Sequence, residues 1–251
     1  MASDTPHPTQ SKPADAATFV IVDDQYSDPR ILMGRRRSTE VFLPDKFVFP
    51  GGRVDPDDHF APFASDLDAS ELRKLLVDMK GGPSPARARA IALAAVRETF
   101  EEAGLLLGVA SRSAPEPAGL DSLGDPWRAF LRHEVMPDLK SLRLLARAIT
   151  PPGRPRRYDT RFFIGSARLI ARRTAARDDE LSDLDWFTIP QLRRLDLPNI
   201  TRAVVEDLAQ FLALPPETQH GWKAPYYCLG SSSLERTLIT CSGLVGVDTN
   251  P

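Results

Sequence analysis

The stretch Arg97-Glu98-Thr99-Phe100-Glu101-Glu102-Ala103-Gly104-Leu105 places three glutamates and an arginine within one and a half turns of a helix. At about 100 degrees per residue, the apolar side chains of this stretch and the turn before it form one stripe. The stripe consists of Leu93, Val96, Phe100 and Ala103. The three glutamates fall on the opposite side. The sequence therefore predicts a helix with one face for the core and one face of clustered carboxylates.

The residues around this stretch indicate where the helix begins and ends. Ser84 is a good N-cap, and Pro85 suits the first helical position. Gly104 is a natural stop at the C-terminal end. We therefore predict a helix that begins at Pro85 and ends near Ala103.

The carboxylate cluster has two interpretations when its residue types are considered alone. A charged helix face is often simply solvated, and Arg97 can pair with Glu101 four residues later. Alternatively, Mg²⁺ and Mn²⁺ favour carboxylate oxygens and keep waters or substrate phosphates as their other ligands. The choice between them depends on the sequence context.

That context resembles the Nudix box, which has Gly, five residues, Glu, seven residues and then Arg-Glu-(apolar)-x-Glu-Glu-x-Gly-(apolar). Residues 97–105 match the second half, with Thr99 in the first apolar slot. Phe49-Pro50-Gly51-Gly52-Arg53-Val54 is similar to the strand end and glycine turn of the first half. The chain is thus identified as a member of the Nudix hydrolase family. The resemblance implies an α+β fold, a Nudix-type α/β/α sandwich with a mixed β-sheet.

The box is interrupted in this sequence. Counted from Gly52, the slot of the first glutamate falls on Asp58, and 38 residues separate Asp58 from Arg97 where the family usually has seven. We interpret residues 53–84 as a helical insertion, with a helix over Ser70 to Lys80. Such an insertion is compatible with the box, because surface loops tolerate added length. Whether Asp58 replaces the first glutamate is left open.

The resemblance implies roles for the residues that match the box. Glu98, Glu101 and Glu102 would ligate one or more Mg²⁺ or Mn²⁺ ions, with the backbone carbonyl of Gly51 completing the set. Glu98 and Glu101 would act in catalysis, and Arg97 would orient a carboxylate. The implied reaction is attack of water on one phosphorus of a diphosphate. Which acid is the general base is left open.

Residues outside the box are further candidates. Arg36, Arg156 and Arg157 could bind substrate phosphates, because a guanidinium pairs with phosphate in a bidentate manner. Their alternative is a structural role in a basic strand or turn. Glu180, in a late acidic loop, is a candidate for an extra base or metal ligand, with a solvated loop acid as its alternative.

The interrupted box, together with Ile149-Thr150-Pro151-Pro152 and the stretch from Arg156 to Phe163, resembles the subfamily that contains the peroxisomal coenzyme A diphosphatase. That relative splits CoA and acyl-CoA into 3′,5′-ADP and a 4′-phosphopantetheine product. We therefore expect CoA or acyl-CoA as substrate. ADP-ribose, NADH or dinucleoside polyphosphates are the alternative substrates. A Nudix module that senses a nucleotide without cleaving it is the non-enzymatic alternative.

Length and composition are consistent with one medium domain. The chain has 251 residues, of which 42% are hydrophobic. We expect a disordered tail over residues 1–16, the hydrolase domain over 17–214, and an irregular C-terminal extension over 215–251.

Charge and residue usage restrict the partners. The net charge of −2 gives no sign of a nucleic-acid binder, and no apolar run is long enough for a membrane span. Two cysteines and no secretory leader fit a cytoplasmic protein. The expected partner is a nucleotide-derived small molecule, and family resemblance favours a homodimer.

Overall fold

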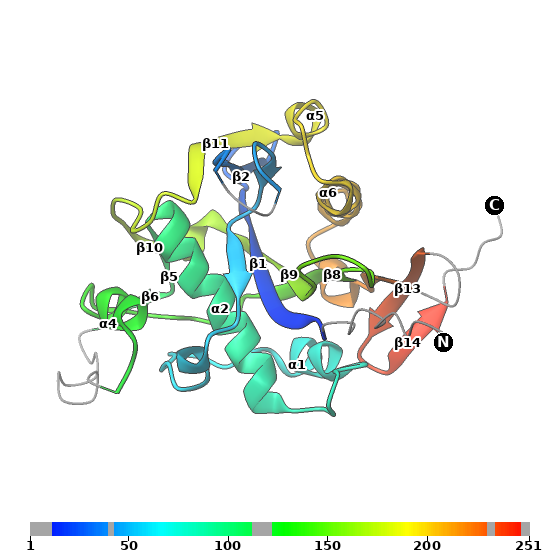
Figure 1. The fold of residues 1–251 in the computed structure, drawn as a ribbon, viewed down its shortest axis with the longest axis horizontal. Helices are drawn as coiled ribbons and strands as arrows, with labels where there is room; N and C mark the ends of the chain where they lie inside the picture. Colours follow the sequence, from blue (N-terminus) through cyan, green and yellow to red (C-terminus); the bar gives the residue numbers. More distant parts are fainter. Residues whose placement is uncertain (1–11, 40–42, 112–121, 230–233, 247–251) are drawn as a thin grey trace, which may run out of the picture.

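The computed structural model describes residues 12–39, 43–111, 122–229 and 234–246. Within these residues, one mixed sheet of ten strands runs through the molecule (Figure 1). Its strands are β1 (Ala14–Asp23), β2 (Arg30–Arg36), β3 (Phe47–Val48), β4 (Gly51–Arg53), β8 (Arg143–Ile149), β9 (Tyr158–Ser166), β11 (Leu181–Thr188), β12 (Ala224–Leu229), β13 (Leu234–Thr240) and β14 (Gly243–Gly246).

The sheet has the order β11-β2-β1-β9-β8-β12-β13-β14, with β3 beside β2 and β4 beside β1. The pairs β1–β9 and β12–β8 are parallel, and the other pairs are antiparallel. The helices are α1 (Ala69–Leu76), α2 (Pro85–Ala103), α4 (Asp125–Leu131), α5 (Ile189–Leu192) and α6 (Asn199–Leu212).

Short elements connect these parts. They are the 3₁₀ turns η1 (Pro56–His59), η2 (Ala167–Leu169) and η3 (Gln219–Gly221), and the strands β5 (Leu105–Leu107), β6 (Val109–Ala110), β7 (Val135–Met136) and β10 (Ile170–Arg173). Strands β5 and β10 form one small sheet, and β6 and β7 form another.

Helices cover both faces of the large sheet, with α2 on one side and α6 on the other (Figure 1). Strand β1 shows why, because successive side chains of a strand point to opposite faces. Phe19 and Ile21 pack in the cluster that contains Leu93 of α2, whereas Val20 packs in the cluster that contains Val204 of α6. The predicted α/β/α sandwich with a mixed sheet is therefore confirmed.

The helix predicted to begin at Pro85 and end near Ala103 is confirmed at both ends. α2 runs from Pro85 to Ala103, and the Ser84 hydroxyl accepts a hydrogen bond from the backbone N–H of Arg87 at 3.3 Å. Gly104 ends the helix with a left-handed φ of 66°. A Cβ at Gly104 would collide with the backbone at Thr174, so this position also needs glycine for space.

The predicted helix of the insertion is shorter than expected. α1 ends at Leu76, and the chain then turns at Asp78, which has a φ of 46°. Arg147 of β8 donates to the carbonyls of Val77 and Asp78, at 2.8 and 3.0 Å. These carbonyls would otherwise belong to a continuing helix, so a distant arginine ends it. Arg53 itself belongs to β4, so the inserted segment begins after this strand.

Both ends of the expected domain need correction. β1 begins at Ala14, so residues 14–16 pair with β9, Ala16 also pairs with β4, and these residues do not belong to a tail. The expected tail over residues 1–11 lies outside the described residues. Residues 224–229, expected to be irregular, form a strand of the large sheet, because β12 pairs with β8 and buries Ala224 and Tyr226.

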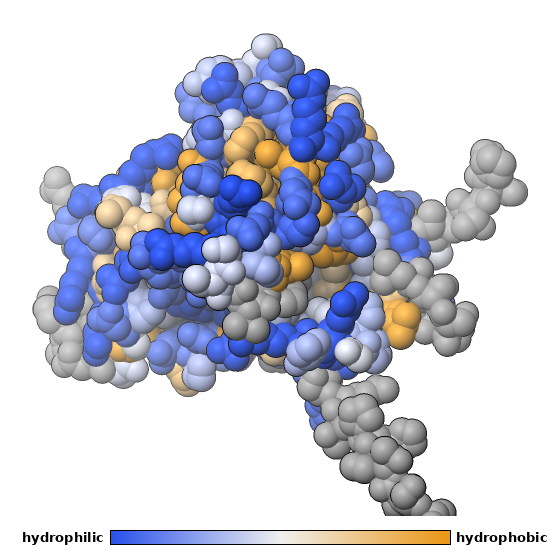
Figure 2. All heavy atoms as spheres, turned by 45° about the horizontal axis from the view of Figure 1, so that its top comes forward, coloured by the Kyte–Doolittle hydropathy of each residue, from blue (hydrophilic) through white to orange (hydrophobic). Residues whose placement is uncertain are grey.

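Most of the face shown in Figure 2 is hydrophilic, with a band of apolar residues near its centre. None of the described helices is long and apolar enough to cross a membrane.

Candidate active site

The glycine turn, formed by Gly51 and Gly52 at the start of β4, lies directly against two glutamates. The backbone N–H of Gly51 donates to Oε2 of Glu102 at 2.7 Å. A Cβ on Gly52 would collide with the carboxylate of Glu98. Glycine at position 52 thus lets the strand end approach the helix closely enough to touch its acids. The Gly51 carbonyl was the predicted metal ligand, and the N–H of the same residue orients Glu102.

Arg97 lies buried at the centre of the acid cluster. Its Nη1 donates to Oε1 of Glu98 at 3.0 Å and to Oε2 of Glu101 at 2.7 Å. Its Nε and Nη2 donate to the two carboxylate oxygens of Asp58, at 2.9 and 3.2 Å. Nη2 also donates to the carbonyl of Arg53 at 2.8 Å. The predicted orienting role of Arg97 fits these contacts, since it connects both halves of the box.

Asp58 contacts Arg97 although the interruption of the box separates them in sequence. It lies in η1, is fully inaccessible to solvent, and accepts a hydrogen bond from Nε1 of Trp127 at 2.8 Å. It also accepts from the backbone N–H of Asp55 at 2.8 Å. The inserted residues therefore leave the pairing of Asp58 with Arg97 intact. Sequence reasoning missed Trp127, because no spacing pattern joins a residue of α4 to the box.

The helix face that carries the glutamates is covered by other parts of the chain. Glu102 is only 1% exposed, and the side chains of Glu98 and Glu101 are each 17% exposed. The helical wheel predicted that all three would lie opposite the apolar stripe. It did not predict that the Gly51 segment packs over Glu102 and buries it.

Burial makes the negative charge of this cluster costly. Burial raises the pKa of Glu98 to about 7, and the charge of Glu101 adds to the increase against the opposing effect of Arg97. Burial also raises the pKa of Glu101. The pKa of Glu102 rises well above its ordinary range, first through burial and then through the charges of Glu98 and Glu180. One arginine thus leaves part of the negative charge without compensation, as a cation site requires.

The late acidic loop approaches the same cluster. The backbone N–H of Asp178 donates to the carbonyl of Glu101 at 3.2 Å, and the charge of Glu180 acts on Glu102. Oε2 of Glu180 lies 3.4 Å from Nη2 of Arg36. The structure therefore brings Glu180 to the edge of the acid cluster, with Arg36 beside it.

The two arginines of the β8–β9 turn lie elsewhere. The carbonyl of Arg157 accepts from the backbone N–H of Ala14 at 2.9 Å, whereas Thr18 of the same strand pairs with Gly51. At about 3.3 Å per residue, this places Arg157 roughly 13 Å along β1 from the glycine turn. Arg156 precedes it in the same turn. The structure does not bring either residue to the acids, and their role in substrate binding stays a prediction.

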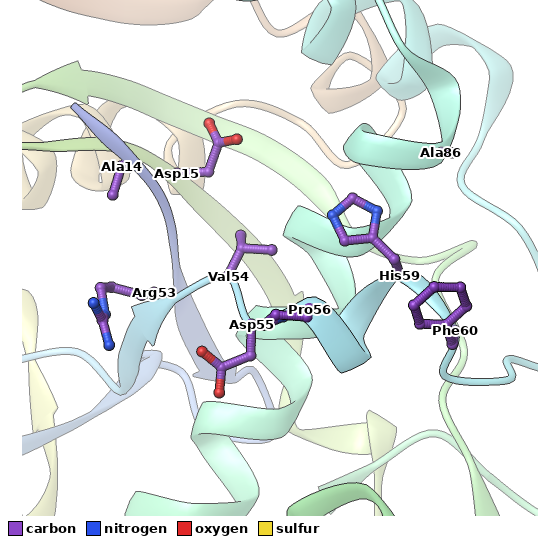
Figure 3. Close-up of a pocket in the computed structure, with 9 residues that line it drawn as sticks. All are labelled: Ala14, Asp15, Arg53, Val54, Asp55, Pro56, His59, Phe60 and Ala86. Carbon is purple, nitrogen blue, oxygen red and sulfur yellow. The ribbon is translucent and has the colours of Figure 1, made fainter. Parts of the chain in front are cut away.

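A groove with a volume of about 690 Å³ opens beside the box (Figure 3). It is lined by the chain from Arg53 to Pro56, by His59 and Phe60, and by the starts of β1 and α2. Sequence reasoning missed this groove, because its walls come from three separate elements.

The donor groups of the acid cluster are all carboxylate and carbonyl oxygens. Among the described residues, no group of three or more His, Cys, Asp or Glu side chains is arranged so that it could hold a metal ion. Arg97 Nη1 lies between Glu98 and Glu101 and supplies the positive charge there. The oxygen-only donors and their raised pKa values still fit Mg²⁺ or Mn²⁺, which bind through carboxylates and keep other positions for water and phosphate.

Comparison with known proteins places this geometry in a family. A family described as the NUDT19 Nudix domain matches residues 7–196. Acyl-coenzyme A diphosphatase NUDT19 of Gallus gallus is 28% identical over 210 residues, which cover 65% of this chain and 55% of that protein. The Xenopus laevis protein of the same name is 25% identical over 205 residues, or 64% and 53%. The chain thus spans about half the length of the curated relatives it matches.

A solved structure of a NUDIX hydrolase is also similar to this chain. The NUDIX hydrolase from Alicyclobacillus acidocaldarius is 30% identical, with a TM-score of 0.58. The alignment covers 79% of this chain and 91% of that one.

Proposed function

This chain belongs to the NUDT19 Nudix domain family, and from that premise we propose that it is a metal-dependent diphosphatase. Its proposed substrate is CoA or acyl-CoA, cleaved to 3′,5′-ADP and a 4′-phosphopantetheine product. The observation that carries the proposal is the buried Arg97, which joins Asp58 to Glu98 and Glu101 across the interruption of the box. The names of the relatives support the choice of substrate.

Three glutamates of α2 would hold Mg²⁺ or Mn²⁺, namely Glu98, Glu101 and Glu102, with the predicted help of the Gly51 carbonyl. When bound, the ion supplies positive charge that polarises a phosphoryl oxygen. Arg97 keeps the carboxylates of Glu98 and Glu101 in place through Nη1. The Gly51 N–H does the same for Glu102.

The proposed reaction is hydrolysis of one P–O bond of the diphosphate. The oxygen of a water molecule bonds to one phosphorus, and the bridging oxygen leaves with the other phosphoryl group. Glu98 is our proposed acceptor of the proton from water, since its carboxylate is partly exposed and lies against the Gly51-Gly52 segment. Glu180, at the edge of the cluster, is the second candidate for this role.

A substrate panel tests the proposal directly. The protein would be incubated with Mg²⁺ and, separately, with CoA, acetyl-CoA, ADP-ribose, NADH and diadenosine polyphosphates, and the products identified by chromatography. We expect 3′,5′-ADP from CoA and acetyl-CoA at the highest kcat/KM. Preference for ADP-ribose or NADH would replace the proposed substrate. Tight nucleotide binding without turnover of any compound would identify a sensing module.

The role of the acids has its own variant. Glu101→Gln should lower kcat by about 100-fold or more, because it removes one of the carboxylate charges proposed to hold the metal ion. The fold should persist, since this side chain is partly exposed and its amide can still accept from Arg97. Glu206→Gln, on the exposed part of α6 with Arg193 as partner, is the matched control and should keep full activity. A near-normal rate for Glu101→Gln would mean that the reaction occurs elsewhere.

A further inference from the structure

The groove beside the box has no role in the site described so far, yet it starts where the catalytic helix is anchored. Arg53 follows Gly52, the residue packed against Glu98, and the carbonyl of Arg53 accepts from Arg97 at 2.8 Å. Oδ2 of Asp55 lies 3.9 Å from Nη2 of Arg97. A molecule with its diphosphate at the acids would therefore meet this end of the groove first.

The chemistry of the groove changes along its length. In Figure 3, Arg53 lies at one end, Val54, Asp55 and Pro56 lie in the middle, and His59 and Phe60 lie at the other end. The Phe60 ring is 75% exposed, more than any other large apolar side chain among the described residues. An aromatic ring left in water at the end of an apolar groove indicates a contact for a ligand.

The charges in the groove do not suit a polyanion along its whole length. The carboxylate of Asp15 is already paired, with Arg87 and with Nη1 of Arg161, the latter at 2.7 Å. Asp55 adds a half-exposed negative charge. The side chain of Arg53 makes no hydrogen bond or ion pair with the described residues, so one phosphate can be met at this end only. Beyond it, a neutral chain with apolar carbons and amide groups fits best.

We propose that this groove binds the acyl-pantetheine arm of the substrate. Arg53 contacts the phosphate from which the arm extends, Val54 and Pro56 pack against the pantetheine carbons, and Phe60 contacts the acyl end. The identity of the arm rests on the proposed function. The other half of CoA, 3′-phosphoadenosine, carries an additional phosphate, and the residues that line the groove include no second lysine or arginine to meet it, so it binds outside the groove.

The test uses the two halves of the substrate as separate probes, so that it does not depend on turnover. S-octanoyl-4′-phosphopantetheine carries the arm without the nucleotide, and 3′,5′-ADP carries the nucleotide without the arm. Binding of each to the full chain would be measured by isothermal titration calorimetry in the presence of Mg²⁺. For Phe60→Ala we expect about 10-fold weaker binding of the acyl probe and unchanged binding of 3′,5′-ADP.

Two further variants make the result specific. Phe60→Tyr keeps the ring and should retain the affinity for the acyl probe. Leu244→Ala truncates an apolar side chain of β14 that is 46% exposed and lies outside the groove, so it should change neither affinity. Because Phe60 is itself largely exposed, its truncation should leave the thermal midpoint almost unchanged, and this is measured alongside.

Several outcomes would overturn the assignment of the groove. They are absence of acyl-probe binding to the unaltered protein, equal affinities in Phe60→Ala and the unaltered protein, and a loss of 3′,5′-ADP binding in Phe60→Ala. Turnover of CoA is measured separately. A protein that binds the acyl probe through Phe60 and does not cleave CoA would refute the proposed function and leave the groove as an acyl-pantetheine site.

Discussion

At the scale of single residues, Asp58 and Arg97 form a buried ion pair with complete hydrogen bonding. Arg97 donates to both oxygens of Asp58, and Trp127 adds a third donor. Removing one member of such a pair leaves the other charge in a poorly solvated place, which typically costs about 3–5 kcal/mol. The stability of the protein and the position of the acids should therefore depend on the same carboxylate.

The variant Asp58→Asn tests this dependence. We expect the free energy of unfolding to fall by about 3 kcal/mol, because the buried guanidinium loses its charged partner. Urea denaturation followed by circular dichroism gives this quantity. Asp55→Asn is the matched control, since its carboxylate is about half exposed and 3.9 Å from Arg97, and it should cost less than about 1 kcal/mol. Equal effects of the two variants would show that Asp58 is an ordinary loop acid.

At the scale of the element, α2 carries its acids at an energetic cost when no ion is bound. Burial raises the pKa of Glu98 from its ordinary value of 4.5 to about 7. The folded chain therefore retains a proton at Glu98 between these values, whereas the unfolded chain releases it. The stability linked to this group is present below about pH 4.5 and is lost as the pH rises to about 7. Glu101 and Glu102 change in the same direction.

A pH series with and without metal follows from this. In the presence of a chelator, the thermal midpoint should fall as the pH rises from 5 to 7.5, apart from effects of other groups. Glu98→Gln should reduce the slope, because this group no longer ionises. Added Mg²⁺ should reduce the fall most at the upper end of the range, where the ionised carboxylates bind the ion. A midpoint that rises with pH in the chelator would refute the proposed charge balance, as would a slope that Glu98→Gln leaves unchanged.

How far the sequence predicted each element depended on where its stabilising partners lie. The bounds of α2 were predicted because Ser84, Pro85 and Gly104 act on the residues next to them. β12 was missed because its burial depends on pairing with β8, almost 80 residues earlier. The helix of the insertion was predicted too long for the same reason.

The candidate site divides in the same way. Arg97 and the three glutamates lie on one helix, so their spacing alone predicted that they lie close together. Asp58, the partner of Arg97, was found only by counting positions from Gly52. No local pattern predicts that Asp58 contacts α2 across the insertion. The burial of Glu102 could not be predicted either. A helical wheel shows only the helix itself, whereas the Gly51 turn that covers Glu102 comes from another part of the chain.

At the scale of the whole molecule, one buried arginine of the sheet connects the insertion to the C-terminal strands. Arg147 pairs with Asp159 at 2.7 Å and donates to the carbonyls of Val77 and Asp78. Its guanidinium also lies 4.7 Å from the ring centre of Tyr226 in β12. The hydroxyl of Tyr226 donates to the side chain of Asp78 at 2.7 Å. The insertion is thus attached to two strands that are remote in sequence, in addition to its contacts with α2.

Arg147→Lys should loosen this attachment while keeping the charge. A lysine has no planar fork and cannot serve the carboxylate and both carbonyls together. We expect faster hydrogen exchange at residues 77–82, measured by mass spectrometry on peptides of the insertion, and a lower thermal midpoint. Arg143→Lys, at the exposed end of the same strand, is the matched control and should leave exchange in the insertion unchanged. If Arg147→Lys lowered the midpoint without changing exchange there, Arg147 would stabilise the sheet alone, and the insertion would be held by α1 and α2.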